Sequence, residues 1–209
     1  PPNRVGTLYQ DLMSAVNSLQ IIGSGDADQV TIDDANGLPT FAGSPALAPD
    51  NILVNDSPGI VFYGAGGTNT LAFALNAANT NQIYGIGGGT DGLGDSNAEM
   101  RTVNGLNALN VYGLNLNQTV RTGGSTGTLA VIAESGNDTI VINAGALATT
   151  DIAATGYAPL NFSGNNYSGI TVFGMGGADT IDLTNLGLGQ SAALPITLDG
   201  DTANDLGVA

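Results

Sequence analysis

Ile170-Thr171-Val172-Phe173-Gly174-Met175-Gly176-Gly177-Ala178-Asp179-Thr180-Ile181-Asp182-Leu183 is the stretch that decides the fold of this chain. Two segments with alternating apolar residues flank a glycine-rich turn that contains one Asp, and alternation with a period of two is typical of β-strands. Variants of this unit lie at Leu19–Ile32, Ile60–Phe73 and Leu129–Ile142, with weaker copies from Leu109 and Ile196. Recurrence of one strand–turn–strand unit indicates a coil that is stacked on copies of itself.

We therefore predict an all-β fold, a right-handed parallel β-helix or related β-solenoid, over residues 19–209. Residues 1–18 form a separate element in this prediction. Thr7 and Gln10 make a capping box, and the apolar residues that follow share one helical face, so we expect a helix from Thr7 to about Asn17 that caps the first coil. No capping element follows the copy that begins at Ile196, and we expect the coils to continue beyond this segment.

The spacing of the units is irregular. We align the residue that follows the bulky apolar position of each copy, and most intervals then fall between 20 and 28 residues, while two are 41 residues long. Each interval of 41 fits either two coils or one coil with a long loop, and residues 52–54 and 160–162 look like extra strands within these gaps. The aligned positions are Gly23, Gly64, Gly85, Gly113, Ala133, Gly174 and Gly200.

Alternation also predicts which side chains face the interior. The first apolar residue after each turn, as in Val30, Ile140 and Ile181, should point inward and stack on its equivalents at the strand spacing of about 4.8 Å. A second ladder should form just before the turns, from Ile22, Tyr63, Tyr84, Tyr112, Ile132 and Phe173.

The composition excludes several classes of function. Three cations, Arg4, Arg101 and Arg121, stand against 18 acids, and the net charge is −15. Nucleic acids and anionic membranes need clusters of Lys and Arg, so neither is an expected partner. No apolar run approaches the roughly 20 residues of a membrane-spanning helix. Cys and His are absent, which removes disulfides, thiol catalysis and imidazole metal sites.

The turns resemble the hemolysin-type calcium-binding repeats of the repeats-in-toxin family, whose consensus is Gly-Gly-x-Gly-x-Asp-x-apolar-x. Residues 174–182 match it except at the second Gly, and residues 135–141 match its second half. The resemblance implies that calcium binds between adjacent turns. Carried over residue by residue, it implies Asp28, Asp138, Asp179 and Asp205 as metal ligands.

This chain also departs from that family. The family repeats every nine residues, whereas the turns here recur every 20 or more, and Asn69 and Gln118 replace the Asp in two copies. A second interpretation therefore stays open, in which Asp and Asn cap the turns by accepting main-chain N–H groups. The pairs Asp33/Asp34 and Asp199/Asp201 are interpreted as solvated turn residues.

From these observations we expect a structural segment of an extracellular or cell-surface bacterial protein, such as a surface layer, filament or adhesin, stabilised by calcium. Its expected partners are further coils, copies of itself, or glycans, with no catalytic residue. The alternative is a carbohydrate-active β-helix enzyme, a polysaccharide lyase or glycosidase. A glycosidase would need two carboxylates roughly 5 to 9.5 Å apart, which Asp138 and Asp179 could supply from stacked coils.

Overall fold

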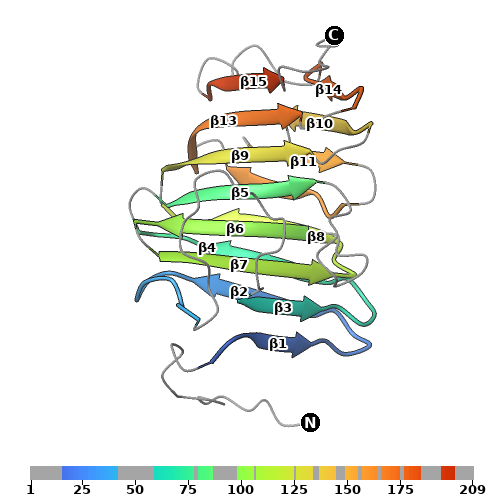
Figure 1. The fold of residues 1–209 in the computed structure, drawn as a ribbon. Coiled ribbons are helices and arrows are strands. Elements are labelled where there is room, and N and C mark those ends of the chain that lie inside the picture. Colours follow the sequence, from blue (N-terminus) through green and yellow to red (C-terminus); the bar gives the residue numbers. More distant parts are fainter. Residues whose placement is uncertain are drawn as a thin grey trace.

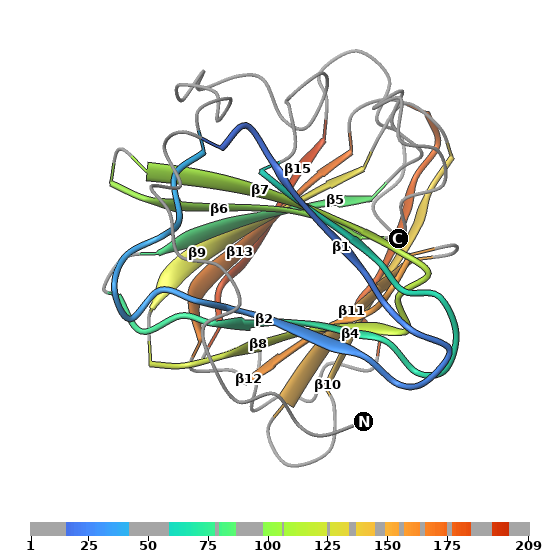
Figure 2. The same ribbon diagram turned by 90° about the horizontal axis from the view of Figure 1, so that it is seen from below.

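The computed structural model describes residues 16–41, 59–77, 80–86, 98–105, 107–124, 126–133, 137–144, 149–154, 157–163, 166–174, 177–184 and 194–200. These residues form two stacked, mixed β-sheets (Figures 1 and 2), and no helix lies among them. The prediction of an all-β fold is confirmed. Most of the expected capping helix, Thr7 to Asn17, lies outside the described residues.

The first sheet has eight strands and lies in front in Figure 1. In spatial order these are β1 (Leu19–Ile22), β3 (Ile60–Tyr63), β7 (Asn107–Leu114), β6 (Ala98–Asn104), β5 (Asn81–Ile86), β9 (Gly127–Ala133), β13 (Tyr167–Gly174) and β15 (Ile196–Gly200).

The second sheet has seven strands and packs behind the first. In the same direction these are β2 (Gln29–Asp33), β4 (Thr70–Ala74), β8 (Gln118–Thr122), β12 (Leu160–Ser163), β11 (Thr149–Ala154), β10 (Thr139–Ala144) and β14 (Thr180–Asp182).

Five times the chain passes from a strand of the first sheet through a short turn to a strand of the second. These strand–turn–strand units are β1–β2, β3–β4, β7–β8, β9–β10 and β13–β14. Strands of successive units pair in parallel, as β1 does with β3 and β2 with β4. Among the described strands, only β6 and β11 run antiparallel to both neighbours, because each is the middle strand of a meander, β5–β6–β7 or β10–β11–β12.

Both intervals of 41 residues are one step of the stack. Strand β3 pairs directly with β1, so residues between Gly23 and Gly64 add no further strand between them. Strand β13 likewise pairs with β9, and β14 with β10, while β11 and β12 pair elsewhere in the second sheet. The predicted extra strand at residues 160–162 is confirmed as β12. The other, at residues 52–54, lies outside the described part of the chain.

The core lies between the sheets and consists of the inward ladders. Ile140 is buried, and Val30 and Ile181 are partly buried and pack against the core, as the alternation predicted. At about 25 cal/mol per Å² of buried apolar area, such ladders are the main stabilising contribution. Fully buried members from the two sheets include Phe62, Tyr84, Val131, Val172, Leu71, Phe73, Ile152 and Leu160.

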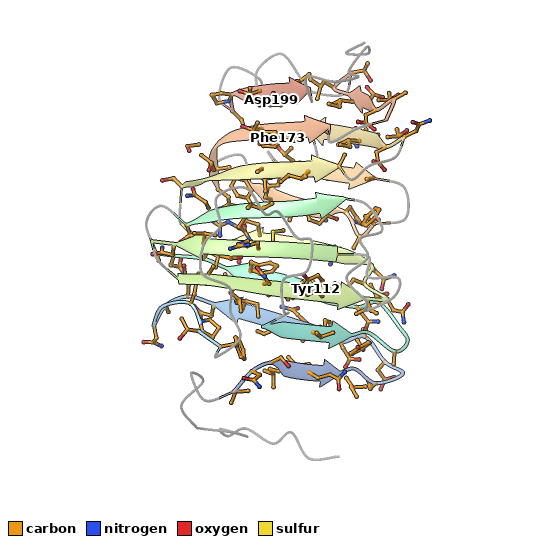
Figure 3. The ribbon with its side chains drawn as sticks, viewed as in Figure 1. Tyr112, Phe173 and Asp199 are labelled. Atoms are coloured by element: carbon orange, nitrogen blue, oxygen red, sulfur yellow. The ribbon has the colours of Figure 1, made fainter. Side chains whose placement is uncertain are left out.

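The second predicted ladder is only partly correct. Ile22 pairs with Tyr63, and Ile132 with Phe173, on the outer face of the first sheet. Tyr84 instead points inward, because β5 belongs to a meander and pairs Tyr84 with the inward Met100. Tyr112 lies on the outer face but pairs with Val61. The partner of Tyr63 is Leu114, two positions later in β7. Figure 3 shows Tyr112, Phe173 and Asp199 on this face, on β7, β13 and β15.

Candidate functional site

The turns that link the two sheets are tied to one another by Asx side chains. The main-chain N–H of Asp28 donates to Oδ1 of Asn69 (3.2 Å), and the N–H of Asn69 donates to Oδ1 of Asn117 (2.7 Å). Nδ2 of Asn69 in turn donates to the carbonyl of Asn115 (3.1 Å). Each side chain thus satisfies a main-chain donor of the neighbouring turn, which otherwise would be buried without a partner.

The register corrects two sequence alignments. Thr70 pairs with Gln118, so Asn117, and not Gln118, stands at the position of Asn69. The glycine assigned at Gly85 does not begin a turn between the sheets, since β5 is followed by the antiparallel β6 of the same sheet. Asn115, with a φ of 55°, follows β7 where Gly64 follows β3. Asn tolerates this left-handed conformation better than most residues. Because Asn115 stands where Gly64 does, the sequence alignment, which began this turn at Gly113, was wrong by two positions.

Asp28 caps its own turn. Its carboxylate accepts the main-chain N–H of Ser24 (2.6 Å) and the hydroxyl of Ser24 (3.2 Å). A Cβ atom on Gly23 would lie 2.7 Å from Oδ2 of Asp28, which explains why a glycine stands five positions before the Asp. The turn-capping interpretation therefore describes Asp28.

Asp138 and Asp179 lie in two further turns that stack on each other. The N–H of Asp138 donates to Oδ1 of Asp179 (2.9 Å), the N–H of Thr180 to the carbonyl of Asp138 (2.8 Å), and the N–H of Ala178 to Oδ1 of Asn137 (2.8 Å). Oδ2 of each of the two carboxylates is buried and has no hydrogen-bond partner among the described residues. Desolvation raises the pKa of Asp138 above its ordinary value, and the nearby charge of Asp179 raises it further.

The structure brings together two of the four predicted metal ligands. Asp138 and Asp179 precede the neighbouring strands β10 and β14, whereas Asp28 precedes β2, at the other end of the second sheet. Asp205 lies outside the described residues. Among the residues that the structure describes, no group of three or more His, Cys, Asp or Glu side chains is placed to hold a metal ion.

Asp34 is a structural residue that the sequence interpretation missed. It is only 2% exposed, while Asp33 beside it is exposed as predicted. Its carboxylate accepts the main-chain N–H groups of Asn76 (2.6 Å) and Ala77 (3.1 Å) and the hydroxyl of Thr80 (3.3 Å). Alternation with Val30 and Ile32 places Asp34 on the inward side, so the signal was present in the sequence. Asp199 is exposed, as interpreted, but it lies in the strand β15 and not in a turn, while Asp201 lies outside the described residues.

A second polar cluster, also not predicted, lies inside the core. The Arg121 side chain on β8 is 1% exposed, and its guanidinium lies 5.3 Å from the ring centre of Tyr167. Burial lowers the pKa of Arg121, and the neighbouring Tyr167 and Asp34 oppose this shift. The hydroxyl of Tyr167 donates to Oε1 of Gln82 (2.6 Å), whose Nε2 donates to Thr102 (3.2 Å). The alternation in β8, where Thr119 and Arg121 share the inward face, was the available signal.

No family model matches the chain, and no curated protein and no solved structure shows significant similarity to it. Among the described residues, no helix is long and apolar enough to cross a membrane.

Proposed function

We propose that this chain is a structural segment of an extracellular or cell-surface bacterial protein, of the kind found in surface layers, filaments or adhesins. The observation that carries the proposal is the parallel, in-register stacking of strand–turn–strand units in two sheets that both have open edges among the described residues. An open strand edge presents unpaired main-chain groups, on which a further unit can stack. The architecture that we propose is a β-solenoid with two strands per coil, interrupted by two meanders.

Calcium is the cofactor that we propose for the Asp138–Asp179 pair. The two buried Oδ2 atoms are hard oxygen donors, and a divalent cation would offset the repulsion between two partly buried carboxylates in a chain of net charge −15. Calcium takes 6 to 8 oxygen ligands, so these two carboxylates would form only part of the shell. Asp28 fits this role less well, because Ser24 already occupies its carboxylate.

The same pair bears on the alternative function, a glycosidase. Such enzymes use two carboxyl groups that lie close together. Oδ2 of each carboxylate is buried, however, and Oδ1 of Asp179 already accepts the main-chain N–H of Asp138, so most of these oxygens face the stacked turns and not a substrate. Stacking therefore explains this geometry better than catalysis does.

Calcium binding is tested by removing calcium with a chelator and then measuring the melting temperature of the protein before and after calcium is added back. Binding to the folded state alone raises stability by about 2.7 kcal/mol at a hundredfold excess over Kd. Asp179→Asn should remove most of the shift, because the amide oxygen can still accept the N–H of Asp138 but binds calcium more weakly. Asp33→Asn, at an exposed carboxylate that accepts the N–H of Ala35, is the matched control and should keep it. An unchanged melting temperature on adding calcium to the parent chain would exclude a stabilising site.

Assembly is tested by imaging the purified chain by electron microscopy with and without calcium. We expect ordered polymers. Ile22→Lys, on the edge strand β1, should shorten or abolish them, because a charge on an edge strand opposes further pairing. Thr122→Lys adds the same charge to an exposed position on the internal strand β8 and should leave the polymers unchanged. Monomers under both conditions, together with cleavage of an acidic polysaccharide, would replace this proposal with the enzymatic one.

A further inference from the structure

The two meanders occupy matching places in the two sheets. Between units β7–β8 and β9–β10, the first sheet contains β6 and β5, and the second contains β12 and β11 (Figure 1). The first pair comes from the part of the chain before residue 123, and the second from the part after residue 126. At this place each half of the chain therefore supplies one wall of the core.

Main-chain pairing joins the halves on both sides of the core. Strand β5 pairs with β9 in the first sheet, and β8 pairs with β12 in the second, both in parallel. The N–H of Thr119 also donates to the carbonyl of Pro159 (2.8 Å). The last strand of the N-terminal half is thus held by the C-terminal half.

Buried side chains cross the same boundary. The hydroxyl of Tyr84 on β5 donates to the carbonyl of Ala158, which lies between β11 and β12. The Tyr167 hydroxyl of the C-terminal half reaches Gln82 of the N-terminal half, and the Tyr167 ring lies against Arg121 of that half. Tyr84, Gln82 and Arg121 are each at most 1% exposed. Without the opposite half, the hydroxyls of Tyr84 and Tyr167 would lose these hydrogen-bond acceptors, which is costly for a buried donor.

We propose that the two meanders form an interlock, the set β5, β6, β11 and β12, which makes the middle of the stack unfold as one unit. A simple coil stack is held by contacts between neighbours and can lose its coils one after another. Here opening β11 and β12 uncovers β5 and β6 as well, although even β6, the later of these two strands, ends at Asn104 and β11 begins only at Thr149. The interlock is a property of the single chain and does not depend on assembly or calcium.

Hydrogen exchange of the full chain, kept monomeric and free of calcium, tests the interlock. Leu160→Ala, at a fully buried position on β12, should accelerate exchange in β5 and β6 by the same factor as in β11 and β12, on the order of 10²-fold. Ile32→Ala, at a buried position on the end strand β2, is the control and should act on β1 to β4 alone.

A milder variant, Ile152→Val on β11, covers the case in which Leu160→Ala does not fold, and it should show the same coupling at smaller amplitude. Acceleration of β11 and β12 with unchanged exchange in β5 and β6, in either variant, would overturn the interlock. Assembly could still be correct in that case, because the proposed polymers need only the open edges.

Discussion

The carboxylate of Asp179 accepts the main-chain N–H of Asp138 across 2.9 Å, although both residues are acids. At the equivalent step of the first three units, the side chain of Asn69 accepts the N–H of Asp28, and that of Asn117 accepts the N–H of Asn69. The same hydrogen bond thus links neighbouring turns whether its acceptor is an amide or a carboxylate. What differs is charge, because only the Asp138–Asp179 step places two carboxylates on adjacent turns.

Asn69→Asp should destabilise the protein by about 1–3 kcal/mol or more. A carboxylate can still accept the N–H of Asp28, but it cannot donate to the carbonyl of Asn115, and it adds a charge at a side chain that is 1% exposed. Urea unfolding measures the loss. Gln118→Glu, at a partly buried position that donates to the hydroxyl of Thr70, is the control and should cost less. Equal losses would mean that burial of Asn69 is not what selects the amide.

Gly23→Ala should destabilise the first turn, because the new Cβ would lie 2.7 Å from Oδ2 of Asp28 and 3.0 Å from the carbonyl of Tyr63. The clash displaces the carboxylate from Ser24, at a cost of about 1–3 kcal/mol. Gly25→Ala, with nothing within 4 Å of its Cβ, should change the melting temperature little. A neutral Gly23→Ala would show that the turn can shift without losing its cap.

Leu71→Ala should cost about 2–5 kcal/mol, since this β4 side chain is fully buried in the inward ladder. Ile22→Ala on β1 removes an apolar side chain that is 73% exposed and should stay within about 0.5 kcal/mol of the parent. Chemical unfolding of both variants tests whether the core lies between the sheets. A large loss at Ile22 would show that this residue is covered in solution.

Alkaline pH should unfold the protein through Tyr84 and Tyr167. Desolvation raises the pKa of both hydroxyls above the ordinary value of about 10; for Tyr84 the nearby Tyr157 adds to the shift, and for Tyr167 the nearby Arg121 opposes it. The stability that comes from keeping these groups protonated is fully present below the unfolded pKa of about 10. As pH rises from there toward the folded pKa, each tyrosine removes up to about 1.4 kcal/mol per pH unit.

Stability measured against pH in the alkaline range checks this. Tyr84→Phe should start less stable, because the carbonyl of Ala158 loses its donor, and should then lose stability with a shallower slope. An unchanged slope in both Tyr84→Phe and Tyr167→Phe would show that neither hydroxyl controls the alkaline transition.

The sequence identified the turns of Asp138 and Asp179 in the candidate site, but it did not distinguish Asp28 from them. The spacing from Gly174 to Asp179 and from Ala133 to Asp138 identified the stacked turns, since related turns recur where the chain passes from the first sheet to the second. The resemblance to calcium-binding repeats treated Asp28 as equivalent to these two residues. The structure separates them, because the carboxylate of Asp28 caps its own turn by accepting the N–H of Ser24, and because β12 and β11 lie between β8 and β10 in the second sheet.

The sequence by itself determined the all-β class, the strands around each turn and the inward direction of residues such as Ile140, because alternation and turn chemistry act over a few neighbouring residues. Only the tertiary structure decided that β6 and β11 run antiparallel and that Tyr84 points inward. It also decided that Asn117, and not Gln118, is the equivalent of Asn69 in the stacked turns. Strand direction and register depend on partners that lie tens of residues away, and a strand such as Ala98–Asn104 carries the same local pattern in either direction. The burial of Arg121 has the same origin, since the Tyr167 ring that it contacts comes from the other half of the chain.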